Sequence, residues 1–303
     1  GISGRVVKIT LSIPTINDYT AADFDALFNL WNQANNDNMD VTFDLSQCEF
    51  LRHNAVAFLG GLARLIEERH GKVTFDWPTL KNNWLRTNLA QNGFMAAFGH
   101  SSGPWSGNSI PYREDKFLDK NNMMDYLKIM WLGRGWVHVS EQLRNAIVGR
   151  VWEIYDNAFI HAQSSIGIFS CGQHYPRHHE LKLTVVDFGV GIPSNVRLFF
   201  RNDPRAESLS AANCLKWAFQ RGTTTKPNGT SRGMGLDLLK EFVKINKGKL
   251  EIFTHEGYAL INKEQEIFMN RQTFFEGTLV NITIICDESY YRLALEADEE
   301  LIF

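Results

Sequence analysis

The sequence has no apolar run that approaches the roughly 20 residues needed to cross a bilayer, and its N-terminus has no charged-then-apolar secretion signal. Its net charge is only -3, from 31 basic and 34 acidic residues, which leaves no electrostatic footprint for nucleic acid or an anionic membrane. Four cysteines in the chain include no Cys-x-x-Cys pair and indicate no disulfide framework. These absences favour a cytoplasmic protein that binds neither nucleic acid nor membrane.

The N-terminal third of the chain alternates between strand and helix patterns. We expect strands over 5–13, 41–45 and 73–77, with helices over 20–36 and 54–70 between them. This order predicts an α/β layer. A stretch rich in Gly, Pro, Ser and Asn follows at 99–122. With 303 residues and 44% hydrophobic content, the chain is large enough for two domains, which we place at 1–108 and 109–303.

A resemblance to a known family lies in this first layer. The segment Asp44–Leu51 (DLSQCEFL), with a helix that starts near His53, resembles the STAS domain of anti-sigma-factor antagonists across about residues 38–80. In that family a Ser at the helix start accepts phosphate, whereas this chain has Arg52-His53-Asn54-Ala55 there. Either the usual switch is absent and Asn54 or a neighbour merely caps the helix, or His53 has a different role.

A second helix, predicted over 140–162, carries polar residues at regular spacing. Ser140 caps it in our prediction, and apolar residues recur along one side. Glu153, Asn157 and His161 are four residues apart, so they share another face, and we predict that they line a nucleotide site. The Asn157 amide oxygen suits Mg²⁺, and the Glu153 carboxylate could take a proton from a nucleophile. A plain stripe of polar surface residues is the alternative.

A carboxylate ends the next buried strand, predicted over 181–187. Gly189 and Gly191 follow Asp187 and would let the backbone turn tightly and approach a flat ligand. The Asp187 carboxylate can accept a hydrogen bond from an exocyclic amine such as adenine N6. The alternative is an ordinary Asp-x-Gly turn.

Residues 219–235 are rich in Gly, Thr and positive charge, and they lead into a helix predicted over 236–245. Backbone N–H groups at a helix start bind anions, and Lys226 and Arg232 would add charge beside a triphosphate. We predict a lid that closes on nucleotide, with an ordinary surface loop as the alternative. Strands are expected over 249–254 and 278–285, and the 258–276 insert between them has no predicted placement.

The order of these motifs resembles the GHKL superfamily across about residues 138–286, nearest to its histidine kinase and anti-sigma-factor kinase branch. The resemblance implies a Bergerat-type α/β sandwich with a mixed sheet and with ATP between sheet and helices. It assigns Asn157 to magnesium, Glu153 to the base and Asp187 to adenine, and Thr278 matches a position that supports the adenine site. It also places four glycines around the nucleotide: Gly189, Gly191, Gly233 and Gly235.

Residues and resemblance together predict a regulatory protein that uses ATP and Mg²⁺ and acts on a protein partner. As an enzyme it would be an ATPase or a histidine/serine kinase-like protein, and hydrolysis and phosphotransfer use the same residues. The alternative is a non-catalytic binding module in which ATP switches partners, because STAS-like domains are typical partners of this ATPase branch. The sequence leaves a homodimer open.

Overall fold

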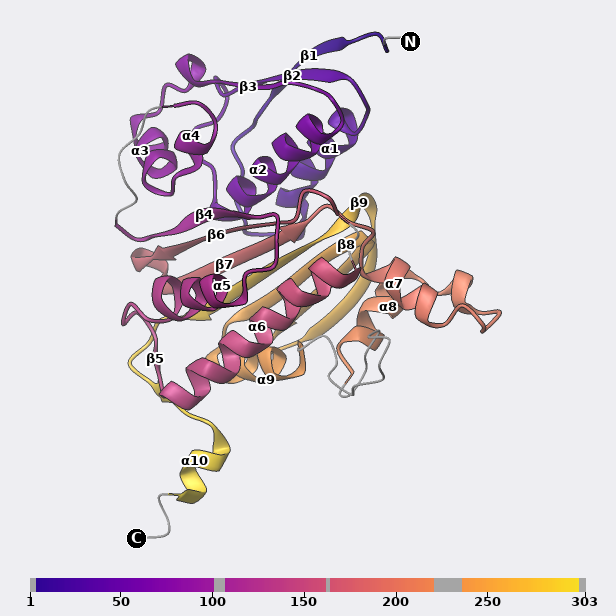
Figure 1. The fold of residues 1–303 in the computed structure, drawn as a ribbon. Helices are drawn as coiled ribbons and strands as arrows, with labels where there is room; N and C mark the ends of the chain where they lie inside the picture. Colours follow the sequence, from indigo (N-terminus) through magenta and orange to yellow (C-terminus); the bar gives the residue numbers. More distant parts are fainter. Residues whose placement is uncertain (1–3, 101–106, 162–163, 221–235, 300–303) are drawn as a thin grey trace.

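The structure, a computed structural model, describes residues 4–100, 107–161, 164–220 and 236–299. Sheets and helices alternate in four layers (Figure 1). A small N-terminal sheet lies outermost, helices α1 and α2 lie beneath it, a five-stranded sheet comes next, and helices including α6 and α9 cover the far face of that sheet. The fold is therefore mixed α/β, as the sequence predicts.

The N-terminal sheet has three parallel strands in the order β1-β2-β3. Its elements are β1 (Val7–Ser12), α1 (Asp25–Ala34), β2 (Met39–Asp44), α2 (His53–Glu68) and β3 (Val73–Asp76). Parallel neighbours need crossover connections, and α1 and α2 supply them. The predicted strand–helix alternation is confirmed here, with ends that differ by a few residues.

The larger sheet has the strand order β4-β6-β7-β9-β8. Its strands are β4 (Ser109–Asp115), β6 (Ile168–Tyr175), β7 (Glu180–Asp187), β8 (Lys249–Asn262) and β9 (Glu266–Ile285). Every described pair in it is antiparallel, so the expected mixed sheet is wrong for this part of the chain. The reason is connectivity: β6–β7 and β8–β9 are hairpins, and β9 returns beside β7 in the opposite direction.

The insert that the sequence could not place, residues 258–276, is the outer half of the β8–β9 hairpin. The two strands pair from Lys249 to Ile261, with register shifts between Thr254 and Gly257. A bulge of this kind interrupts the alternation of buried and exposed residues, so a single long strand is hard to recognise from the sequence.

The remaining elements are helical except for one short strand pair. The longer ones and the strand pair are α3 (Asn83–Gln91), α4 (Phe94–Ala97), α5 (Lys120–Asp125), a π-helix (Tyr126–Trp131), β5 (His138–Val139), α6 (Glu141–His161), α7 (Ile192–Phe199), α8 (Ala211–Ala218), α9 (Leu236–Asn246), β10 (Tyr290–Tyr291) and α10 (Ala294–Glu299). The others are short 3-10 helices at Ala21–Phe24, Trp77–Thr79, Pro176–His178 and Ala206–Ser208. Within the described ranges, no helix combines the length and the apolar character that a membrane span requires.

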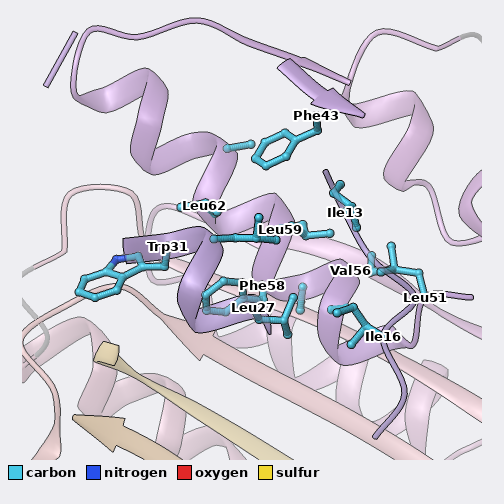
Figure 2. Packing of buried hydrophobic residues seen from close by; sticks show 14 of the residues in the cluster. Ile13, Ile16, Leu27, Trp31, Phe43, Leu51, Val56, Phe58, Leu59 and Leu62 are labelled. Carbon is cyan, nitrogen blue, oxygen red and sulfur yellow. The ribbon is translucent and has the colours of Figure 1, made fainter. Parts of the chain in front are cut away.

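One hydrophobic core joins the N-terminal layer to the five-stranded sheet. Figure 2 shows its N-terminal side, where residues of α1 and α2 such as Leu27, Trp31 and Phe58 pack together. The same cluster continues into the sheet through Phe188 of the turn after β7 and Phe275 of β9. The expected boundary near residue 108 falls between α4 and β4, yet this core is continuous across it.

Phe275 lies at the centre of this shared core. Its side chain is fully buried, and its ring lies 5.2–5.6 Å from the rings of four other aromatic residues, which belong to α1, to α2 and to the turn after β7: Phe28, Trp31, Phe58 and Phe188. Aromatic pairs at this spacing add to the energy of burial itself. The N-terminal layer and the sheet therefore stabilise each other.

We predict that Phe275→Ala lowers the free energy of unfolding by about 3–5 kcal/mol, because it opens a cavity among four rings. The neighbouring Phe274 is 44% exposed, so Phe274→Ala should cost about 1 kcal/mol or less. Urea unfolding followed by tryptophan fluorescence and by circular dichroism would measure both. Equal losses in the two variants, or separate transitions by the two probes in the wild type, would contradict a shared core.

Candidate functional site

Helix α6 carries the predicted polar face. Ser140 caps the helix, since its Oγ accepts the N–H of Leu143 at 3.0 Å, as predicted. Glu153 and Asn157 are both buried, with 9% and 7% of their surface exposed. The surface-stripe alternative is therefore wrong for these two residues. His161 ends the helix, and its side chain lies outside the part that the structure describes.

Glu153 has one carboxylate oxygen engaged and one unengaged. Its Oε1 lies 3.4 Å from Nη1 of Arg150, one turn earlier on the helix. Its Oε2 is buried and has no hydrogen-bond partner among the described residues. Leaving a buried charged oxygen unpaired costs free energy, so such a group points to a partner such as water or substrate.

Asp187 forms the second part of the candidate site, at the end of β7. Its side chain is 8% exposed, and its Oδ1 accepts the N–H of Gly189 at 2.9 Å. Burial raises the pKa of this carboxyl to about 7, although the bond from Gly189 lowers it. An aspartate that holds its proton near neutral pH is unusual, and any ligand that donates a hydrogen bond to it would favour its ionised form.

Gly191 requires its glycine identity. Its φ is +84°, and a Cβ built there would overlap the carbonyl oxygen of Glu276 and the ring of His255. His255 in turn lies 2.7 Å from the carbonyl oxygen of Val190, through its Nε2. The tight turn predicted for the glycines after Asp187 is thus confirmed at Gly191.

Thr278 lies directly opposite Asp187 in the register of β7 and β9. Its Oγ1 is 3.1 Å from Oγ1 of Thr254, which lies opposite it on β8. Thr254 also accepts the N–H of Ile192, at the start of α7, at 3.1 Å. Sequence analysis missed Thr254 and His255, and the only available signal was that Thr254 ends the predicted strand 249–254.

The α6 residues and Asp187 lie on the same face of the sheet. Side chains alternate along a strand, so Asp187 faces the same way as Leu181, Leu183 and Val185. Those three residues share the second core with buried residues of α6: Leu143, Ile147, Val148, Val151 and Tyr155. The structure therefore brings one face of the sheet and the polar helix together.

Tyr155 fixes the position of α6 along the sheet. Its Oη lies 2.6 Å from Oγ of Ser170, which pairs with Val185 on β7. Asp187 is two residues further along, a step of about 7 Å in a strand. Tyr155 lies between Glu153 and Asn157 in the sequence, so the stretch of α6 backbone that carries these two residues is held beside this part of the sheet.

The predicted lid residues Lys226, Arg232, Gly233 and Gly235 lie outside the described residues, and α9 begins at Leu236. That these residues form a lid that closes on nucleotide therefore stays a prediction. Within the described ranges, no group of three or more His, Cys, Asp or Glu side chains is arranged to hold a metal ion. A magnesium ion here would depend on Asn157 and on oxygens of the nucleotide itself.

His53, left open by the sequence, lies in a buried polar cluster between the N-terminal layer and the sheet. Its Nδ1 is 2.9 Å from Oη of Tyr175, and burial lowers its pKa to about 3. Asp18 pairs with Lys182 of β7 at 2.6 Å and with Arg52 at 3.5 Å. Asn54 does not act as a cap: α2 starts at His53, and its N-cap residue Arg52 makes no side-chain cap bond.

Comparisons with known proteins add no family. The chain matches no family model, and no curated protein matches it in sequence.

We predict that Asp187→Asn stabilises the nucleotide-free protein progressively as pH rises. An unfolded aspartate ionises near pH 4 whereas Asp187 ionises near 7, so the stability contributed by its protonated form is full below about pH 4 and is lost as pH rises to about 7. Asparagine cannot ionise and keeps an acceptor for the Gly189 N–H.

Relative to wild type, the variant should therefore gain about 2–4 kcal/mol of unfolding free energy between pH 4 and pH 8. Urea titrations across this range measure the gain. Asp37→Asn, the same change at an exposed position, is the control and should alter the unfolding free energy by about 0.5 kcal/mol or less. A pH-independent difference between Asp187→Asn and wild type would show that Asp187 does not titrate near neutral pH.

Proposed function

We propose that this chain is an ATP-binding regulatory protein that uses Mg²⁺ and either hydrolyses ATP or transfers its γ-phosphate to a protein partner, in the manner of GHKL-type kinases. One observation carries the proposal: a buried carboxylate oxygen of Glu153, without a hydrogen-bond partner in the part of the chain that the structure describes, lies on the same side of the sheet as the buried carboxyl of Asp187. Buried carboxyl groups that are incompletely paired are typical of a functional site.

In this proposal Asp187 accepts a hydrogen bond from the adenine amine. The carboxyl is desolvated, so the bond is made in a low-dielectric setting where it counts for more than in water. Thr278 and Thr254 tie β9, β8 and the start of α7 together beside it. The adenine contact is thereby carried by paired strands, which hold their positions better than a loop would.

Glu153 would orient or deprotonate the nucleophile. Arg150 pairs with one of its oxygens, and the other has no partner within the described ranges, which suits a general base that must meet water or a partner's side chain. Asn157 would offer its amide oxygen to Mg²⁺, and the ion's role in such sites is to neutralise the charge of the triphosphate. Hydrolysis and phosphotransfer differ only in which nucleophile Glu153 meets.

A second candidate function is a non-catalytic module in which ATP controls the binding of a partner. The observation that favours it is the core that the N-terminal layer shares with the sheet, because a STAS-like layer packed on an ATP-binding sheet is placed to respond to nucleotide. The two candidate functions differ in whether the γ-phosphate of ATP leaves the nucleotide.

We predict that Glu153→Gln leaves the dissociation constant for ATP within about threefold of wild type and lowers turnover by about 10²–10⁴-fold, because glutamine cannot accept a proton. Glu141→Gln, in the exposed first turn of the same helix, is the matched control and should leave both unchanged. Incubation with γ-labelled ATP and Mg²⁺ shows whether label ends on protein, on a partner or as free phosphate.

Unchanged turnover in Glu153→Gln would remove Glu153 as the base. Binding of ATP with no turnover in the wild type, with or without candidate partners, would favour the non-catalytic module. A wild-type protein that does not bind ATP at all would overturn both candidates.

A further inference from the structure

Two adjacent glycines, Gly60 and Gly61, lie in the middle of the buried helix α2. Glycine costs a helix about 1 kcal/mol relative to alanine, so a pair of them inside a helix needs a compensating contact. Here the two glycines let side chains of the five-stranded sheet and of the turn after β7 approach the helix backbone closely. A methyl group on Gly60 would overlap Tyr112 of β4, and one on Gly61 would overlap the ring of Phe188 and, less closely, the ring of Phe169 on β6.

Phe188 follows Asp187 directly, on the opposite face of the sheet. Its ring lies 5.2 Å from that of Phe58, on α2, and 5.3 Å from that of Phe275. Asp187 bonds the N–H of Gly189, so the turn that orients this carboxylate has Phe188 as its middle residue. A displacement of the Phe188 ring that shifts its backbone therefore also shifts that turn.

Helix α2 is also held at several points along its length, so it transmits rather than absorbs movement. At its start, Asp18 joins Arg52 of the N-cap to Lys182 of β7 in a buried pairing. At its end, Glu68 accepts a hydrogen bond from Ser165 at 2.9 Å. The whole stretch from His53 to Ala63 is buried between the two sheets.

We propose that α2 sets the nucleotide affinity of the candidate site through Phe188, so that the N-terminal layer regulates ATP binding from the face of the sheet opposite the nucleotide. This inference rests on the proposed function and names its regulation. Phe188 is then a positioning residue: it never touches the nucleotide and acts through Asp187. By linkage, a partner that moves α2 against Phe188 changes ATP affinity, and ATP changes the affinity for that partner by the same factor.

The glycine pair provides a matched test. Gly60→Ala and Gly61→Ala add the same methyl group to the same helix and bring the same gain in helix propensity, but only the second presses on Phe188. We expect Gly61→Ala to raise the dissociation constant for ATP by about tenfold or more, and Gly60→Ala to change it by less than about threefold. Calorimetry with the full chain and Mg-ATP measures both, with thermal unfolding of the nucleotide-free variants alongside.

A second pair of variants tests the same coupling in case Gly61→Ala does not fold. Phe188→Leu should weaken ATP binding as Gly61→Ala does. Phe43→Leu makes the same change at a fully buried position of the N-terminal sheet, beside Phe75, and should leave ATP binding unchanged. Carbon-13 resonances of the Asp187 carboxyl, followed over pH, should shift their midpoint in Phe188→Leu and not in Phe43→Leu.

The outcomes separate this inference from the proposed function. Wild-type binding with unchanged affinity in Gly61→Ala and Phe188→Leu would overturn the coupling and leave the ATP site standing. Equal weakening in the test and control variants would also overturn it, because the effect would then follow stability and not the contact with Phe188. Absence of wild-type binding would remove the proposed function itself.

Discussion

The burial of β7 on both faces is the constraint on which the rest of this structure depends. From Leu181 to Asp187 every residue of the strand is buried, with α2 on one side and the helices around α6 on the other. Polar side chains on a strand in that position are buried, so each needs a hydrogen-bond or ion-pair partner or has a functional role. Lys182 finds Asp18 in the N-terminal layer, and Asp187 ends the strand as a carboxyl that gives up its proton reluctantly.

The candidate site is accordingly a place where the fold gives up stability. Apolar residues at the positions of Glu153 and Asp187 would give a higher free energy of unfolding. The packing of the aromatic cluster around Phe275 stabilises the fold and offsets this loss. The N-terminal layer is therefore part of the same folding unit as the sheet, because its helices cover a sheet face whose aromatic rings would otherwise be exposed to water.

Hydrophobic periodicity in the sequence identified the N-terminal alternation, α6, β7 and α9, because each has an uninterrupted pattern of buried positions. It did not predict α3, α4, β6, α7 or α8, and it did not recognise the β8–β9 hairpin beyond the bulge at Thr254. Helical spacing was enough to pair Glu153 with Asn157. The partner of His53 was beyond reach, since Tyr175 is 122 residues away and their contact depends on how two sheets stack. The Gly60–Gly61 pair was a readable signal of close packing that sequence reasoning did not use.

The central position of β7 in the sheet protects its backbone amides from exchange with solvent. Its backbone amides are bonded to β6 on one side and β9 on the other, and helices shield both faces. Exchange of such amides with deuterated solvent requires unfolding on the scale of the whole molecule, whereas the outer end of the β8–β9 hairpin opens by local fluctuation. The carboxyl of Asp187 is thus carried by a strand whose opening requires such large-scale unfolding, and its geometry persists through fluctuations that disturb the periphery.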